Sequence, residues 1–142
     1  MQKIEDVILF QIDLTSKVSK QYSQREFDKL KLGITVEQWV VLKIISENKD
    51  LSQKELANKS YRDPASITRT IDLLEKKDLV VRKNIPNNRR VYNISLTEQG
   101  ESFIKSNMKI IKEHRELSIQ GLSNDDLNSL SDLLSKIRGN MT

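Results

Sequence analysis

Basic and small polar side chains are concentrated in one part of the sequence. Residues 53–90 contain ten Lys and Arg against five Asp and Glu, a net charge of +5. The other residues contain 14 basic and 15 acidic side chains, a net charge of −1, so this segment supplies the formal +4 of the chain. Lys and Arg bind phosphate groups, and Ser, Thr and Arg can hydrogen-bond the edges of bases. The segment therefore predicts contact with nucleic acid.

The helix predicted from Pro64 onward has two different sides. At about 100° per residue, Ile67, Ile71 and Leu74 form a side to be buried, with Thr70 near it. The opposite side combines small residues, hydroxyl groups and a guanidinium group that could contact base edges in a major groove. Its residues are Ala65, Arg69 and Asp72, flanked by Ser66 and Thr68. An ordinary solvated helix face is the alternative for this helix taken alone.

Two arginines follow a turn-rich segment. Asn84–Asn88 lies between two β-prone runs, Leu79–Val81 and Tyr92–Leu96, and the second run alternates apolar and polar residues. This pattern predicts a β-hairpin whose tip carries Arg89 and Arg90. The negative potential of a minor groove could attract one of them. A charged turn that only aids solubility is the alternative.

Capping residues mark the helices that must position these side chains. Thr35 and Ser52 are each followed three residues later by a partner for a capping box, Gln38 and Glu55. Asp63 precedes a proline, which favours the first helical position. The low content of Gly (4) and Pro (2) also favours long helices.

Two helical regions flank the central part. Ile4–Leu32 contains no Gly or Pro, has apolar residues on more than one side, and is predicted to stay helical up to Gly33. Thr97–Gln120 predicts a further helix, and Ser123 begins a last one. The last helix has an apolar stripe formed by Leu127, Leu130, Leu133, Leu134 and Ile137. A second copy of the chain could cover this stripe; packing on the first helix of the same chain is the alternative.

These elements predict a mainly α fold with a small β-hairpin wing, a winged helix–turn–helix plus a helical dimerisation region. We expect an N-terminal dimerisation helix in residues 1–34, a DNA-binding domain in residues 35–100, and C-terminal dimerisation helices in residues 101–142.

Five short blocks resemble, in order and spacing, the signature of the MarR family of transcriptional regulators. They are Leu51–Ala57, Ser66–Arg69, Leu74–Lys77, Pro86–Arg90 and Leu96–Gly100, and Thr35–Trp39 resembles the opening of the family's second helix. The resemblance implies a homodimeric repressor whose recognition helices enter major grooves of a near-palindromic operator in double-stranded DNA. The predicted DNA contacts are Ser52, Lys54, Ala65, Ser66, Thr68, Arg69, Arg89 and Arg90.

Three positions depart from the family pattern. Asn88 replaces the aspartate that precedes the wing arginine by two residues, and Asp78 replaces a glycine after the Glu-Lys-Lys run. Leu73 stands where a basic residue is frequent. Asn88 and Leu73 support the second hypothesis, a winged-helix module that binds proteins and no longer binds DNA specifically.

The resemblance also implies an effector. Many family members bind small aromatic or anionic ligands between the dimerisation region and the winged domain, and Phe10, Trp39 and Leu42 are the candidate lining residues. Trp39 as an ordinary core residue is the alternative. The absence of Cys and the single His114 argue against thiol oxidation and against a zinc site, so we expect no metal and no cofactor.

The sequence does not predict an enzyme. It lacks Cys, a histidine with a partner motif and a Gly-rich phosphate loop. No apolar run is long enough to span a bilayer, and Met1–Asp6 lacks the apolar core of a signal peptide. We therefore expect a soluble cytoplasmic protein.

Overall fold

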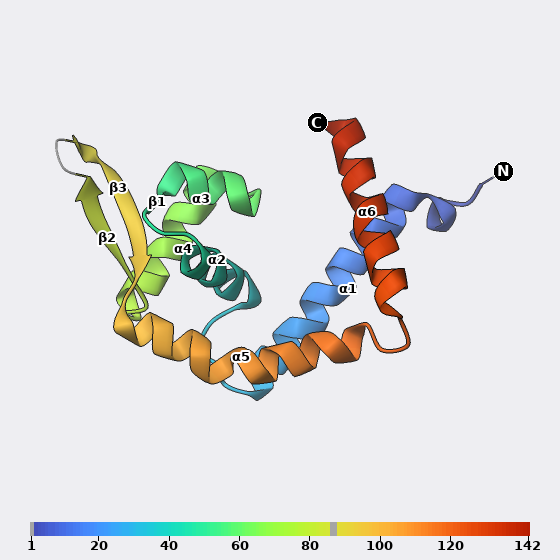
Figure 1. The fold of residues 1–142 in the computed structure, drawn as a ribbon, viewed down its shortest axis with the longest axis horizontal. Coiled ribbons are helices and arrows are strands. Elements are labelled where there is room, and N and C mark those ends of the chain that lie inside the picture. Colours follow the sequence, from blue (N-terminus) through green and yellow to red (C-terminus); the bar gives the residue numbers. More distant parts are fainter. Residues whose placement is uncertain (1, 86–87) are drawn as a thin grey trace. The chain divides into compact units, whose positions relative to one another are not determined.

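A computed structural model describes residues 2–85 and 88–142, without the side chains of residues 88–91 (Figure 1). Within this part of the chain there are six α-helices: α1 (Ile8–Lys29), α2 (Val36–Glu47), α3 (Gln53–Ser60), α4 (Pro64–Lys76), α5 (Glu98–Ser118) and α6 (Asn124–Met141). A 3₁₀ turn, η1 (Ile4–Asp6), precedes them, and the strands are β1 (Leu51–Ser52), β2 (Val80–Ile85) and β3 (Asn88–Leu96). The mainly α winged helix–turn–helix class is confirmed. The chain forms two compact units, residues 1–108 and 109–142.

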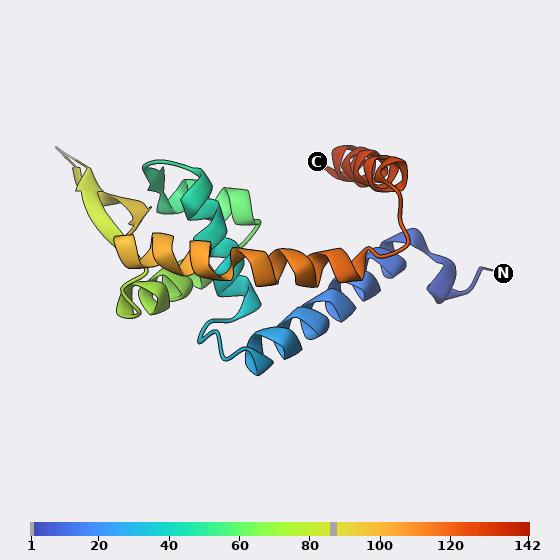
Figure 2. The same cartoon turned by 60° about the horizontal axis from the view of Figure 1, so that its bottom comes forward.

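The wing is a small antiparallel sheet in the order β1-β3-β2. β2 pairs with β3 from Val80 opposite Leu96 to Asn84 opposite Tyr92, which confirms the predicted hairpin. β1 adds a third strand, with Leu51 opposite Ile94, that the sequence pattern did not indicate. Figures 1 and 2 both show the hairpin extending away from α2, α3 and α4.

The predicted caps are present. Thr35 Oγ1 accepts from the Gln38 backbone N–H at 3.1 Å, and the Gln38 side chain accepts from the Thr35 N–H at 3.1 Å. Ser52 and Glu55 form the same reciprocal pair, and the Asp63 carboxylate accepts from the backbone of residue 66 at 2.8 Å. Each cap satisfies backbone donors that a helix start leaves without partners.

The core of the first unit lies where α2, α3, α4 and β3 meet. Its fully buried side chains include Trp39, Val41, Leu42, Leu56, Ile67, Ile71, Leu74, Val80 and Ile94. The predicted buried side of α4 is therefore confirmed. Gly100 allows a close approach to this core, because a Cβ there would lie 2.1 Å from the Leu79 carbonyl oxygen.

The first helix is shorter than predicted. The expected helix from Ile4 is interrupted at Val7, which is extended and supplies no side-chain cap. The helix also ends before Gly33, because Lys31 adopts the left-handed conformation with φ of 51°. The Lys31 N–H donates to Asp28 O at 3.2 Å and the Leu32 N–H donates to Phe27 O at 3.2 Å. This hydrogen-bond pattern is a Schellman motif, which ends a helix wherever a left-handed residue follows it.

The second unit contains the end of α5 and all of α6. α5 ends at Ser118, two residues earlier than predicted, and Gly121 is left-handed with φ of 90°. α6 is capped by Ser123 and contains no buried residue. Leu130 and Leu133 are exposed, whereas Leu127, Leu134 and Ile137 are half-buried. No described helix is both long and apolar enough to cross a membrane.

Candidate nucleic-acid interface

The face of α4 opposite the core is open to solvent. Ala65, Arg69 and Asp72 are exposed, while Ile67 and Ile71 on the other side are fully buried. The Arg69 side chain makes no hydrogen bond or ion pair with any other residue that the structure describes. Its guanidinium is thus available for a bidentate contact with an external acceptor.

The two hydroxyl residues of this helix that were predicted to contact DNA, Ser66 and Thr68, already have internal partners. Arg62 Nη2 donates to Ser66 Oγ at 2.6 Å. Thr68 Oγ1 accepts from the Gln53 side chain and donates to the Pro64 carbonyl at 2.9 Å. Both side chains are half-buried. The Ser66 hydroxyl keeps a proton to donate outward, whereas the Thr68 proton is used within the helix.

The predicted contacts on α3 lie at its first turn. Ser52 is the N-cap, and its Oγ accepts from the Glu55 N–H at 3.1 Å. Lys54 is exposed in the same turn. The helix therefore presents one cation beside its own positive end, an arrangement suited to a phosphate group. The side chains of Arg89 and Arg90, the predicted wing contacts, lie outside the described residues.

Arg82 connects the wing to α4, a role that sequence reasoning missed. Its guanidinium lies 2.6 Å from Asp72 Oδ1 and 3.0 Å from Glu75 Oε1, and its side chain is 17% exposed. The Arg82 backbone N–H donates to Glu75 Oε2 at 3.3 Å. Asp72 thus has a cationic partner, which offsets its negative charge on the open face of α4. Two acids three residues apart on a helix followed by a strand arginine could have indicated this cluster.

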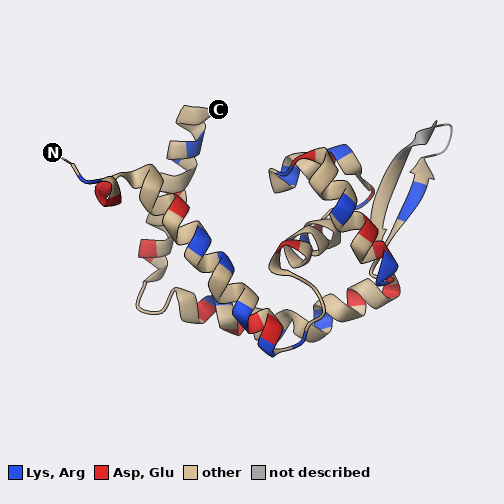
Figure 3. Cartoon of the chain, turned by 180° about the vertical axis from the view of Figure 1, so that it is seen from behind, with Lys and Arg blue, Asp and Glu red and all other residues tan. Residues whose placement is uncertain are grey.

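Arg62 connects α4 to α2 in a similar way. Its Nη2 lies 3.4 Å from Glu37 Oε2 as well as 2.6 Å from Ser66 Oγ. Lys20 of α1 lies 4.0 Å from the other oxygen of Glu37. From the sequence, Arg62 and Arg82 are among the basic residues predicted to bind phosphate. In the structure both form ion pairs that hold α4 in place. Figure 3 shows further Lys and Arg positions on α3, α4 and β2.

The three candidate effector residues lie on two helices, α1 and α2. Trp39 and Leu42 are fully buried in α2, and the ring of Trp39 packs 6.3 Å from that of Phe103. Phe10 lies on α1 with 36% of its surface exposed. None of the three lines the cavities described in the structure.

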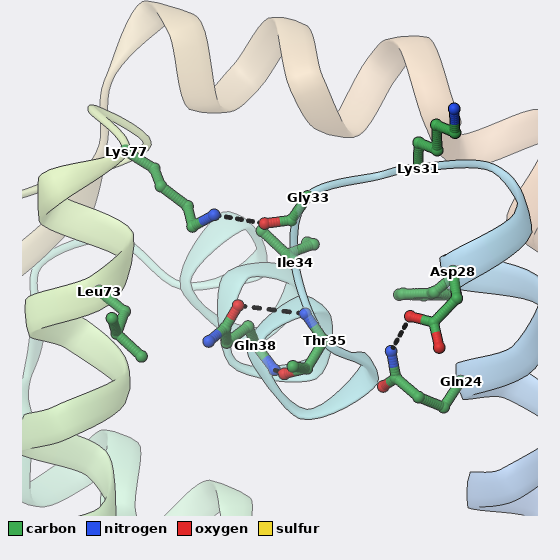
Figure 4. A pocket seen from close by; sticks show the side chains of 10 residues that line it. Gln24, Asp28, Lys31, Gly33, Ile34, Thr35, Gln38, Leu73 and Lys77 are labelled. Carbon is green, nitrogen blue, oxygen red and sulfur yellow. Dashed lines mark hydrogen bonds between the residues drawn. The ribbon is translucent and has the colours of Figure 1, made fainter.

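A cavity of about 440 Å³ lies instead beside the link between α1 and α2 (Figure 4). The side chain of Lys77, the C-cap of α4, crosses it and donates to the Gly33 carbonyl oxygen. Gln24 Nε2 donates to Asp28 at 2.9 Å, and its Oε1 accepts from the Val36 N–H at 3.1 Å. The lining residues are Gln24, Phe27, Asp28, Lys31, Gly33, Ile34, Thr35, Gln38, Leu73 and Lys77. No cluster of described residues is suited to a metal ion.

Comparison with known proteins identifies the family. The MarR family model matches residues 34–92. Several solved structures match nearly the whole chain, among them the following three. A MarR/EmrR family transcriptional regulator from Acinetobacter sp. ADP1 has 22% identity and a TM-score of 0.89, covering 99% of this chain and 98% of that one. The transcriptional regulator SlyA has 26% identity and a TM-score of 0.82, covering 94% and 93%.

The third structure is the S. aureus MepR–DNA complex, with 21% identity and a TM-score of 0.82, covering 94% of this chain and 98% of that one. At their low identities, the Acinetobacter and S. aureus proteins establish the fold. The family match lies over the helix–turn–helix and the wing, and the flanking helices have counterparts in all three structures. The chain, with its transcriptional-regulator fold, belongs to the MarR family.

Proposed function

We propose that this protein is a homodimeric repressor that binds a near-palindromic DNA operator. The observation that carries the proposal is the open face of α4, where Arg69 has no partner among the described residues while Arg62 and Arg82 link the helix to α2 and β2. A recognition helix must be positioned rigidly to read base edges. MepR, which shares the fold, has been solved in complex with DNA.

The proposal assigns roles to three parts of the chain. Residues 35–100 bind DNA, with Ala65, Arg69, Ser66 and Thr68 in the major groove and Arg89 and Arg90 at the minor groove. Ser52 and Lys54 contact the phosphate backbone. Residues 1–34 and 101–142 form the dimer, because α6 exposes leucines that a second copy would cover.

Replacement of Arg69 tests base reading. Arg69→Ala should weaken binding to a selected operator by about 1–3 kcal/mol per half-site and relax its base preference. Arg69→Lys, the matched control, keeps the charge but loses the planar pair of donors, so it should retain non-specific affinity and lose specificity. Fluorescence anisotropy with a duplex recovered from random sequence and with a scrambled duplex measures both effects.

The same titration separates DNA binding from the alternative, a protein-binding module. Each phosphate neutralised by a cation releases counterions, so wild-type affinity should fall steeply with salt. Affinity that is weak and independent of salt would contradict DNA binding. An equal loss for Arg69→Ala on both duplexes would assign Arg69 to the backbone.

We also propose that a small aromatic or anionic ligand releases the DNA by binding the cavity in Figure 4. Lys31 and Lys77 provide the positive charge, and Phe27, Ile34 and Leu73 provide apolar contact. A bound anion would compete for the Lys77 ammonium, which otherwise contacts Gly33 in the link to α1. Aromatic carboxylates should raise the Tm of wild-type protein and not that of Lys77→Met. Equal shifts in both proteins would place the ligand elsewhere.

A further inference from the structure

Tyr61 is an exposed aromatic residue in the turn between α3 and α4. The residue is 86% exposed, more than any other large apolar residue that the structure describes. Among the described residues, none forms a hydrogen bond with its hydroxyl or an aromatic contact with its ring. Packing within the chain therefore does not account for a tyrosine at this position.

The backbone conformation of Tyr61 favours a different residue. Its φ is 53° and its ψ is 40°, in the left-handed region. The Tyr61 N–H donates to Asn58 O at 3.3 Å and the Arg62 N–H donates to Ala57 O at 3.1 Å, which completes a Schellman motif at the end of α3. Glycine or asparagine is preferred there because a Cβ crowds the following carbonyl. Tyrosine is thus both strained and unsupported by the fold, a combination that points to an external contact.

The position of Tyr61 relates it to the proposed DNA interface. It lies two residues before Asp63, the N-cap of α4. It is therefore close in sequence to the N-terminal end of α4, where the exposed face with Ala65 and Arg69 begins. The side chain of its neighbour Arg62 is bound to Glu37 and Ser66, so the turn is fixed. Lys59 is exposed in the last turn of α3. We therefore expect the phenol to lie at the edge of the proposed interface, near the phosphates that border a major groove.

We propose that Tyr61 contacts the DNA backbone, with its hydroxyl donating a hydrogen bond to a phosphate oxygen and its ring packing on the adjacent deoxyribose. This inference rests on the proposed function. A phosphate contact orients the protein on the duplex but carries no base information, and an uncharged donor releases no counterion. The contact should therefore add affinity equally on all sequences without changing the salt dependence.

Two variants test the contact by fluorescence anisotropy. Tyr61→Phe removes only the hydroxyl and should weaken the dimer's binding about tenfold, on both a selected duplex and a scrambled one, with an unchanged salt slope. Tyr61→Gly should lose at least as much affinity while its Tm stays equal to that of the wild type or rises, because glycine suits the left-handed backbone. Asp78→Gly is the matched control, since Asp78 has φ of 60° at the opposite end of α4; its Tm should not fall and its DNA affinity should not decrease.

Wild-type affinity for Tyr61→Phe would overturn the hydroxyl–phosphate contact. A fall of several degrees in the Tm of Tyr61→Gly would assign the ring to folding and overturn it as well. If the wild type itself shows no salt-dependent binding to either duplex, the proposed function fails. If the wild type binds DNA and both Tyr61 variants bind it with the affinity of the wild type, only this inference fails.

Discussion

Helices α4 and α6 have similar sequence patterns but differ in how much of their apolar side is buried. Each begins after a capping side chain, Asp63 or Ser123, and each has an apolar side and a polar side. α4 buries Ile67, Thr70, Ile71 and Leu74 within its own chain, whereas α6 buries none of its residues. An amphipathic pattern predicts that the apolar side of a helix is buried, but not whether the same chain or a second molecule buries it.

The difference suggests that α4 contributes to the folding stability of one chain and α6 to the stability of a dimer. Removal of apolar contacts from α4 acts on the folding of one chain, because the neighbours of Ile71 belong to that chain. Removal of apolar surface from α6 acts, in our proposal, on the association of two chains. The two helices can therefore be told apart by whether a substitution has an effect that depends on protein concentration.

The largest expected effect comes from the core side of α4. Ile71→Ala should lower the free energy of unfolding by about 2–5 kcal/mol, because it leaves a cavity beneath a fully buried side chain. Urea denaturation followed by circular dichroism measures the loss. Leu73→Ala is the matched control on the same helix, because Leu73 is 43% exposed, and this substitution should lower the free energy of unfolding much less. Equal losses for the two variants would contradict the difference between the sides of α4.

A smaller effect, on association, is expected from α6. Leu130→Asp places a carboxylate on the exposed apolar stripe and should weaken the dimer by about 2–3 kcal/mol, or roughly a hundredfold in dissociation constant. Sedimentation equilibrium measures the change. Ser131→Asp adds the same charge at the next exposed position and should leave the dimer intact. A Leu130→Asp protein that remains as dimeric as the wild type would show that this stripe is covered in another way.

Much of the fold could be predicted because the signals are local. The capping boxes at Thr35 and Ser52, the start of α4 at Asp63 and the buried spacing of Ile67, Ile71 and Leu74 are all set by residues three or four positions apart. Helical geometry brings such residues together whatever the rest of the chain does. The exposure of Arg69 followed from the same periodicity.

The ends of helices were predicted less well. Gly33 was expected to stop the first helix, but Lys31 takes the left-handed position instead. Asp78, which replaces the family's glycine after the Glu-Lys-Lys run, is left-handed after α4 with φ of 60°. Residues other than glycine can adopt the left-handed conformation when the hydrogen bonds that end the helix offset its steric cost. Glycine therefore marks a preferred helix end and not an obligatory one.

The order of residues along the chain settles where helices start, which of their sides is apolar and where the hairpin forms, since each of these depends on a few adjacent dihedral angles. The third strand at Leu51, the Arg82 contacts with Asp72 and Glu75, and the link from Arg62 to Glu37 exist only in the folded chain. These contacts join residues from 7 to 43 positions apart. Their geometry depends on how whole elements pack, and no short-range preference of the backbone encodes it.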